Sequence, residues 1–404
     1  MTLVRECDVL IVGGGVTGLW LANDLDARGH QFVLFERQEL GGAQTCHSHV
    51  YIHQGYIYNE QARDLAVHLK DVTPIWWKWL RGHPWLIESS SSFFGFSNET
   101  EYALKTALWS KPDVQMGYSE VARSDWPEAL LPSAAGASRI RHLVLAPEVS
   151  LNGHLLVSAL ENSVRESICR MESFTLIRAD ASGIEAEACI ANGARMRVRA
   201  RYLVFAAGSG NLKLLMDSFP GEIDSAKSPQ QIRRAHMLVI KGRPTDLPLL
   251  NGVFASLEGL FLVSRQGRDE NVWLVSDYRN GLIETHEDEI VYNRRWWLPL
   301  VLENLQHLAP AVMARSDRFR WGVYEAPKAE GSGSGKLPEK ERIYYVKGRN
   351  TWAVWPTKLT LAPLASRALL EQMELRPIRP GIAPEKWETT ECVTWDEFES
   401  GEGL

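Results

Sequence analysis

The hydrophobic pattern is clearest at the N-terminus, where two short apolar runs enclose an amphipathic segment. The first run, Val9–Val12, ends in a cluster of glycines, and the second, Phe32–Phe35, ends at Glu36. Between the two runs, apolar side chains recur at three- and four-residue spacing, which predicts a helix over Val16–Arg28. An apolar run, a helix and a second apolar run in this order are typical of the β-α-β unit of a parallel sheet.

Further along the chain, apolar residues recur with helical spacing in several segments. These are Asn59–Lys70, Pro74–Arg81, Leu155–Arg165 and the stretch that begins at about Ala365. Apolar runs predict an antiparallel sheet from Ala235–Ile240, Gly259–Val263 and Val272–Ser276. Residues 89–145 consist of short, irregular segments with several prolines, and the glycine-serine stretch Ala329–Gly335 is expected to form an exposed flexible loop.

The glycines after the first apolar run have the spacing Gly-x-Gly-x-x-Gly, at Gly13, Gly15 and Gly18. In this motif the first glycine allows a tight turn, the second lets the backbone approach a pyrophosphate, and the third lets helix and strand pack closely. Glu36 follows Gly13 by about twenty residues, where an acid can accept hydrogen bonds from an adenosine ribose. The unit therefore predicts a dinucleotide site at the N-terminus of the helix.

The residues after Glu36 bear on which dinucleotide is bound. Arg37 follows, and then a second glycine-containing loop, Leu40–Thr45. A further strand-to-glycine unit, Arg201–Asn211, offers another place where backbone can meet the cofactor. A loop of this kind suits FAD, which extends well past its pyrophosphate, whereas NAD-linked dehydrogenases do not need it. FAD is therefore the favoured cofactor.

Composition narrows the class of protein. The chain has 404 residues, 45% of them hydrophobic and 23% charged, which suits one cofactor domain plus one substrate domain. A net charge of −6 disfavours binding to nucleic acid or anionic membranes. Five scattered cysteines without a CxxC pair argue against a disulfide framework or a zinc site, so no metal is expected. Without a signal peptide or a long apolar run, a cytoplasmic protein with no transmembrane segment is expected.

Tryptophan is unusually abundant, with 15 residues, several of them clustered at positions 76–79 and 296–297. Such clusters can cover a core or a subunit contact, line an aromatic substrate pocket, or form a docking surface.

The layout resembles the D-amino-acid-oxidase-like (DAO) superfamily of FAD-dependent oxidoreductases over most of the chain. The resemblance rests on the N-terminal motif with Glu36, the unit Tyr202–Asn211 and the C-terminal Leu359–Pro363. It implies an α+β fold, in which an α/β FAD-binding domain of glutathione-reductase type carries an inserted antiparallel-sheet substrate domain. Residues 1–88, 146–230 and 340–404 would form the FAD-binding domain, and residues 89–145 and 231–339 the substrate domain.

Within the superfamily, Thr45–Tyr58 is similar to the flavin-facing loop of L-2-hydroxyglutarate dehydrogenases. The matching positions are His47, His53, Gly55 and Tyr58. Val50 stands where a glycine is usual, and His49 is an additional imidazole. Many amino-acid oxidases of the superfamily hold the substrate carboxylate with an arginine that Tyr324 replaces here, which makes a simple α-amino acid a doubtful substrate.

The motifs and the resemblance together mark a set of cofactor contacts. They are Gly13, Gly15, Val16, Thr17, Gly18, Glu36, Arg37, Gly42, Ala43, Thr45, His47, Ala207, Gly208, Pro356, Thr357, Lys358, Leu359 and Thr360. His47 either tethers FAD covalently, as a histidine of this loop does in some family members, or leaves it non-covalently bound.

Three residues are candidates for catalysis: His53, Lys358 and Tyr324. His53 either removes the hydroxyl proton of the substrate or only forms hydrogen bonds. Lys358 either stabilises charge at the pyrimidine end of the flavin or is a surface lysine. Tyr324 is expected in the substrate pocket. Arg265 and Tyr278 contact a polar substrate or are solvated strand residues.

The sequence thus predicts an FAD-dependent oxidoreductase, an oxidase or a dehydrogenase. It would oxidise a CH–OH or CH–NH group of a small molecule by hydride transfer to flavin N5, most like a 2-hydroxy-acid dehydrogenase or oxidase. One alternative is an amine oxidase of a specialised biosynthetic pathway. Another is a non-catalytic dinucleotide-binding protein with a regulatory or docking role. Oxygen, a quinone or another protein would be the electron acceptor, and no nucleic-acid partner is expected.

Overall fold

The computed structural model describes the main part of the chain and shows a mixed α+β fold. The described residues are 2–58, 63–190, 193–224, 228–254, 257, 259–277, 283–284, 287–332, 340–356 and 358–376. Their strands form sheets of seven, nine and three strands.

The seven-stranded sheet has a parallel centre. Its parallel strands, in spatial order, are β9 (Ile168–Asp180), β2 (Phe32–Glu36), β1 (Thr2–Val12), β11 (Arg195–Phe205) and β19 (Thr351–Trp355). Antiparallel partners are β10 (Gly183–Ile190), between β9 and β11, and β18 (Arg342–Val346), beside β19. The C-terminal end of β1, Val9–Val12, is continuously apolar and buried, as expected for a parallel strand that is covered on both faces.

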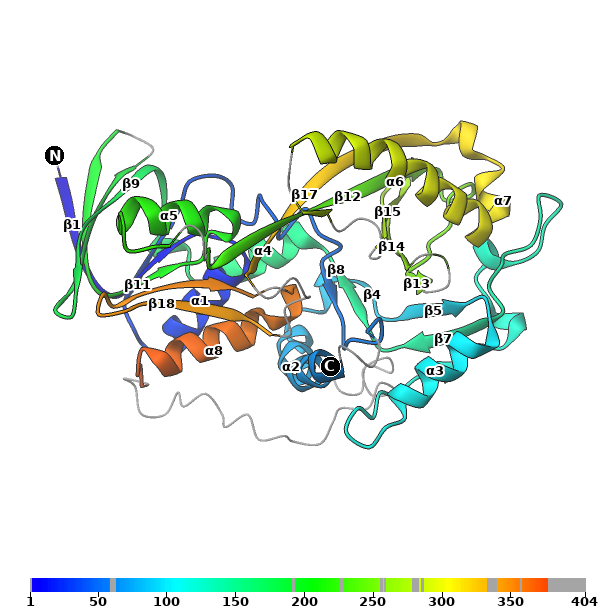
Figure 1. The fold of residues 1–404 in the computed structure, drawn as a ribbon, viewed down its shortest axis with the longest axis horizontal. Coiled ribbons are helices and arrows are strands. Elements are labelled where there is room, and N and C mark those ends of the chain that lie inside the picture. The colour runs from blue at the N-terminus through cyan, green and yellow to red at the C-terminus, as the bar shows by residue number, and fades with distance from the viewer. Residues whose placement is uncertain are drawn as a thin grey trace.

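Helices cover both faces of this sheet. On one face lie α1 (Val16–Ala27), α2 (Arg63–Arg81), α4 (Gly153–Asn162) and α8 (Ala362–Gln372), and on the other α5 (Asn211–Ser218). Successive side chains of β1 point to opposite faces of the sheet. Ile11 therefore belongs to the hydrophobic core that includes α1 and α8, whereas Leu10 belongs to the core that includes α5. Figure 1 shows α1 and α8 on one side of β11 and β18, with α5 on the opposite side.

The nine-stranded sheet is mostly antiparallel. Its strands are β5 (Ser92–Phe96), β6 (Ser119–Glu120), β7 (His142–Ala146), β12 (Gln230–Gly242), β13 (Gly252–Phe254), β14 (Leu260–Gln266), β15 (Asn271–Asp277), β16 (Ile283–Glu284) and β17 (Arg320–Gly331). Helix α6 (Glu287–Leu308) covers one face, where Trp297 is fully buried against Trp273 and its neighbours, and α7 (Pro310–Met313) follows it (Figure 1). Helix α3 (Glu99–Trp109) lies beside β5 and β7.

The smallest sheet consists of β3 (Tyr51–Ile52), β8 (Val149–Leu151) and β4 (Ile87–Ser89). Its strand β8 follows β7 of the nine-stranded sheet after two residues. Strand β3 therefore lies close to the junction of the two larger sheets, which matters for the site described below.

Several sequence predictions are confirmed and others are wrong. The predicted antiparallel strands exist as β12, β14 and β15. The two helices predicted on either side of residue 73 are one helix, α2, which continues through Pro74 because its apolar face is unbroken and buried. Residues 89–145 contain β5, α3 and β7 rather than only irregular segments. Ala329–Gly331 is not an exposed loop, since these residues extend β17 and are buried against β12; residues 333–339 lie outside the described residues.

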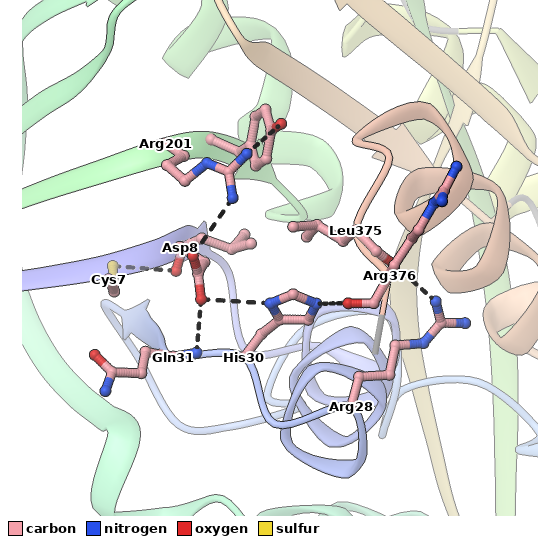
Figure 2. A network of polar contacts seen from close by, with 10 residues as sticks. Cys7, Asp8, Arg28, His30, Gln31, Arg201, Leu375 and Arg376 are labelled. Atoms are coloured by element: carbon pink, nitrogen blue, oxygen red, sulfur yellow. Dashed lines mark hydrogen bonds and ion pairs between the residues drawn. The ribbon is translucent and has the colours of Figure 1, made fainter. Parts of the chain in front are cut away.

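The C-terminal end of α8 is fastened to the β1–α1–β2 unit through a polar network (Figure 2). The ring of His30 lies with Nε2 2.9 Å from the carbonyl oxygen of Arg376 and with Nδ1 3.4 Å from the carboxylate of Asp8. Arg28 donates from its guanidinium to the Leu375 carbonyl oxygen over 3.1 Å. The segment that follows α8 is thereby tied to the unit that carries the glycine motif.

Within the part of the chain that is described, no helix has the length and apolar character needed to cross a membrane.

Candidate active site

The glycine motif forms a turn that only glycine can adopt. Gly13 has φ +116°, and a Cβ at this position would lie 2.5 Å from the carbonyl carbon of Ala206 at the end of β11. A Cβ at Gly18 would overlap the carbonyl oxygen of Gly13. The carboxyl ends of β1 and β11 thus come into direct backbone contact, and the N-terminus of α1 opens beside them.

Two further contacts shape this turn. The carboxylate of Glu36 accepts hydrogen bonds from the backbone N–H groups of Gly14 (2.6 Å) and Gln38 (2.7 Å). The Thr45 hydroxyl oxygen accepts a hydrogen bond from the N–H of Val16 over 3.1 Å, which satisfies one of the free donors at the start of α1. Glu36 is therefore fixed next to the glycine turn at the end of β2.

Residues 45–58 form a segment with three histidines, referred to below as the histidine segment, and β3 lies at its centre. Val50 has φ +49°, the left-handed region that favours glycine and strains a β-branched residue. The ring of His49 lies 4.1 Å from the ring of Phe261 on β14, centroid to centroid. The Tyr324 hydroxyl on β17 donates to the carbonyl oxygen of His47 over 3.3 Å. The segment thus contacts two strands of the nine-stranded sheet.

Thr360, which is far from the histidine segment in the sequence, forms hydrogen bonds with it. The N–H of His53 donates to the hydroxyl oxygen of Thr360 (3.3 Å), and this hydroxyl donates to the carbonyl oxygen of Tyr51 (3.4 Å). Trp76 of α2 donates its indole N–H to the carbonyl oxygen of Thr360 over 2.8 Å. Thr360, which is fully buried, therefore fixes the position of His53 relative to the turn that carries Lys358.

Two imidazoles of the segment are held in the neutral form. Burial and the charges of Lys358 and Lys328 lower the pKa of His53 to about 3. Burial and the charges of Lys328 and Arg265 lower the pKa of His49 to about 3. Nδ1 of His53 and Nε2 of His49 are buried without a hydrogen-bond partner. Each ring thus keeps one nitrogen available to a ligand.

A family model described as "FAD dependent oxidoreductase", DAO, matches residues 8–371. The chain belongs to the DAO family of FAD-dependent oxidoreductases. It is 25% identical over 415 residues to the probable FAD-dependent oxidoreductase PA4991 of Pseudomonas aeruginosa, covering 96% of this chain and 99% of the relative. The DAO-family chain is therefore an oxidoreductase that uses FAD, and the non-catalytic alternative is set aside.

The fold is similar to that of solved oxidases. Glycine oxidase from Geobacillus kaustophilus matches with a TM-score of 0.63 and 17% identity, over 94% of this chain and 98% of that one. L-α-glycerophosphate oxidase from Mycoplasma pneumoniae, solved in its dithionite-reduced form with FAD bound, matches with a TM-score of 0.67 and 14% identity, over 93% and 97%. At these identities the likeness concerns the fold.

The residues proposed as FAD contacts come from three distant parts of the chain. Gly13 packs on Ala206 and Ala207, and the buried Asn211 joins this turn to β19, since it accepts from the Ala207 N–H (2.7 Å) and donates to the Val354 carbonyl oxygen (2.9 Å). The loop with Gly42 and Ala43 is held to the glycine turn by a hydrogen bond from the Gly41 N–H to the Gly14 carbonyl oxygen, 2.9 Å long. Thr357 lies outside the described residues.

The remaining candidates are less closely grouped. Arg37 and His47 are exposed, and Nδ1 of His47 lies 2.8 Å from the carbonyl oxygen of Ala43. Arg265 is paired with Glu88, with 3.0 Å between Nε and Oε2. Tyr278 lies outside the described residues. Two charged groups were missed at the sequence level, Lys328 and Glu148, because neither belongs to a motif or a periodic pattern.

These features fit a dinucleotide with a redox-active ring. The glycine turn leaves room for backbone to meet a pyrophosphate, and the fixed carboxylate of Glu36 suits a ribose hydroxyl. The buried, unpartnered nitrogens of His49 and His53 indicate that a further hydrogen-bonding group belongs beside the histidine segment. Among the described residues, no group of three acidic, histidine or cysteine side chains is arranged to hold a metal ion.

Proposed function

We propose that this oxidoreductase oxidises a CH–OH group of a small anionic molecule, most like a 2-hydroxy acid. The observation that carries the proposal is the neutral imidazole of His53, which has a buried free nitrogen and stands near two lysine charges. Bound FAD would supply the acceptor for the hydride of the substrate carbon. The protein has to orient the substrate and remove its hydroxyl proton.

His53 is our candidate for removing that proton. Its lowered pKa keeps the ring neutral, so a nitrogen lone pair is available, but it also makes the resting imidazole a weak base. An anion bound beside Lys328 and Lys358 would offset their charges and raise the pKa of His53 above the value that burial and the two lysines give it now. A carboxylate on the substrate would therefore both hold it in place and activate its base.

Lys358 and Tyr324 are proposed to act at the two ends of the site. Lys358 follows β19 and is partly buried, where its charge can stabilise the electron-rich pyrimidine end of the reduced cofactor. Tyr324 is half-buried on β17 and is fixed to the His47 carbonyl oxygen, so it is placed at the substrate side of the histidine segment.

The proposal includes how the chain is divided. Residues 1–88, 146–230 and 340–404 are assigned to FAD and residues 89–145 and 231–339 to the substrate. FAD would be held by the glycine turn, Glu36, the loop with Gly42 and Ala43, and residues of the stretch from Pro356 to Thr360. Non-covalent binding through these groups is expected to release all flavin on acid precipitation, whereas flavin that stays with the protein would indicate a tether at His47.

The test is anaerobic titration of the FAD-loaded protein with a panel of 2-hydroxy acids, neutral alcohols and primary and secondary amines, followed by the visible flavin absorbance. Bleaching by 2-hydroxy acids supports the proposal. Bleaching by amines alone contradicts it and favours the amine oxidase. Repeating the active titration with oxygen, a soluble quinone and a protein acceptor identifies the electron acceptor.

The role of His53 is tested with His53→Ala and a matched control, His68→Ala. In the wild type, His68 of α2 pairs with Glu341. Loss of a general base typically costs about 10²- to 10⁴-fold in rate. We expect a loss in this range for His53→Ala and a change of less than about twofold for the control. A His53→Ala rate within a few-fold of the wild type would leave His53 with hydrogen bonding only.

A further inference from the structure

A fully buried carboxylate, Glu148, lies directly behind the histidine segment. It is located between β7 and β8, in a chain region that no motif marks. Strand β8 pairs with β3 so that Val149 is opposite Ile52, and Glu148 is therefore one position beyond this pair, beside His53 and Gln54.

The described hydrogen bonds of the Glu148 carboxylate connect it to the histidine segment. Oε2 accepts from the Tyr51 hydroxyl over 3.0 Å, and Oε1 accepts from the backbone N–H of Gln54 over 2.8 Å. The backbone amides of Gly55 and Tyr56 also point to this carboxylate and stabilise its charge. An ionised carboxylate suits this set, because it only accepts, the backbone N–H groups only donate, and the Tyr51 hydroxyl donates here.

The backbone around the carboxylate is held in its shape from the other side. Gly55 has φ +95°, and a Cβ there would lie 2.8 Å from Cα of Ala66 on α2. The Gln54 side chain donates to the Pro147 carbonyl oxygen over 2.9 Å, next to Glu148 itself. Residues 54–56 thus surround the Glu148 carboxylate with their backbone N–H groups, and His53 directly precedes them in the sequence.

We propose that Glu148 is a positioning residue for the active site: by accepting hydrogen bonds from Tyr51 and from the backbone of residues 54–56, its ionised carboxylate fixes the segment that presents His53. The proposal rests on the proposed placement of the histidine segment beside FAD. It does not require His53 to be the base, because Glu148 acts on the segment as a whole.

The protonation state of Glu148 changes the hydrogen bonds that fix the histidine segment. A protonated carboxyl turns one acceptor into a donor, so it can no longer accept from all of the backbone N–H groups and the Tyr51 hydroxyl that now donate to it. Burial raises the pKa of Glu148 to about 7, despite the opposing effect of its hydrogen bonds, so the change falls within the physiological range. The titratable groups that face the carboxylate are the phenols of Tyr51 and Tyr56, whose pKa values are raised by burial and by its charge. The ring of His53 stacks on that of Tyr51.

The first test is a pH titration of the visible spectrum of the FAD-loaded protein between pH 5.5 and 9. The wild type is expected to show a spectral transition near neutral pH. Glu148→Gln, which resembles the protonated acid, is expected to show no such transition and to have the low-pH spectrum throughout. Tyr51→Phe removes a donor that stabilises the carboxylate, so its transition is expected at higher pH. Glu88→Gln, which changes a different and only partly buried acid, is expected to keep the wild-type transition.

The second test is hydrogen exchange of the same holoenzymes at pH 8, read by mass spectrometry on peptides that cover residues 51–58. Glu148→Gln is expected to exchange at least about tenfold faster there, with no change in peptides from α1. The proposal is overturned if the variant exchanges like the wild type, or if the spectral transition persists in Glu148→Gln. Should Glu148→Gln fail to bind FAD, an unshifted transition in Tyr51→Phe would overturn it.

The two proposals can fail separately. Full activity of His53→Ala would remove the proposed base but leave the Glu148-dependent transition and exchange rates in place. A Glu148→Gln protein with wild-type spectra and exchange would remove the positioning role and leave the His53 result unaffected.

Discussion

His49 should make the protein sensitive to mild acid, and the size of the effect can be worked from its environment. His49 is 8% exposed and its Nε2 has no partner, and burial together with the charges of Lys328 and Arg265 lowers its pKa from 6.5 to about 3. Between these two values the native state binds fewer protons than the unfolded state, so the free energy of unfolding falls as pH falls from 6.5 toward 3.

The magnitude follows from about 1.4 kcal/mol for each pKa unit. From pH 7.5 to pH 5 the unfolded histidine becomes almost fully protonated while the native one stays neutral, so His49 alone should lower the free energy of unfolding by about 2 kcal/mol. His49→Gln removes the titrating group and keeps a polar side chain of similar length. The variant should therefore lose about 2 kcal/mol less stability than the wild type over this pH interval.

The assay is urea-induced unfolding of both proteins at pH 7.5 and pH 5, with FAD at the same fixed excess throughout. For each protein the free energy of unfolding at pH 5 is subtracted from that at pH 7.5. This subtraction cancels any change in stability that the substitution causes equally at both pH values. His154→Gln, at an exposed position of α4, serves as the matched control and should retain the wild-type pH difference. The reasoning would be refuted if the free energy of unfolding of His49→Gln changed between the two pH values by the same amount as that of the wild type, within about 0.5 kcal/mol.

Three further substitutions test the cofactor site. Gly13→Ala, which needs a left-handed alanine and a Cβ 2.5 Å from Ala206, should lower the free energy of unfolding by about 3 kcal/mol or more in denaturant titrations; a loss below 1 kcal/mol would contradict the close contact. Glu36→Gln should weaken FAD binding by about tenfold or more in fluorescence titrations, and an unchanged affinity would remove the ribose role. Lys358→Met should lower the two-electron reduction potential of the bound flavin by about 30 mV, measured with reference dyes; an unchanged potential would place Lys358 away from the ring.

The parts of the fold that could be predicted are those with local patterns. The unit β1–α1–β2 is encoded by apolar runs, helical spacing and glycines within one short stretch, and β12, β14 and β15 show up as apolar runs. The course of the chain through Pro74 could not be predicted, because the apolar face of α2 outweighs the local preference of proline to end a helix. Similarly, Ala329–Gly331 has a loop-like composition but gains its structure from pairing with β12.

The candidate site was predictable to the same extent. The glycine motif, Glu36 and the histidine segment carry recognisable chemistry and spacing, so they could be named from the sequence. Glu148 could not, since a single acid after a proline is usually solvent-exposed. Its role depends on the pairing of β8 with β3, which joins residues about one hundred positions apart, and no local signal records such a pairing.

The order in which the strands of the seven-stranded sheet leave the ribosome has a consequence for how this protein is made. Strand β1 pairs with β11, with Val9 opposite Tyr202. One edge of β1 therefore stays unpaired during synthesis until a strand about 190 residues further along the chain has been made. At about 5 to 20 residues per second, synthesis of that partner takes roughly 10 to 40 seconds. Strand β19 follows only near residue 351. A newly made chain therefore carries an open, apolar strand edge until β11 has been made, which exposes it to aggregation during synthesis. The parallel sheet is complete only after β19 has been translated.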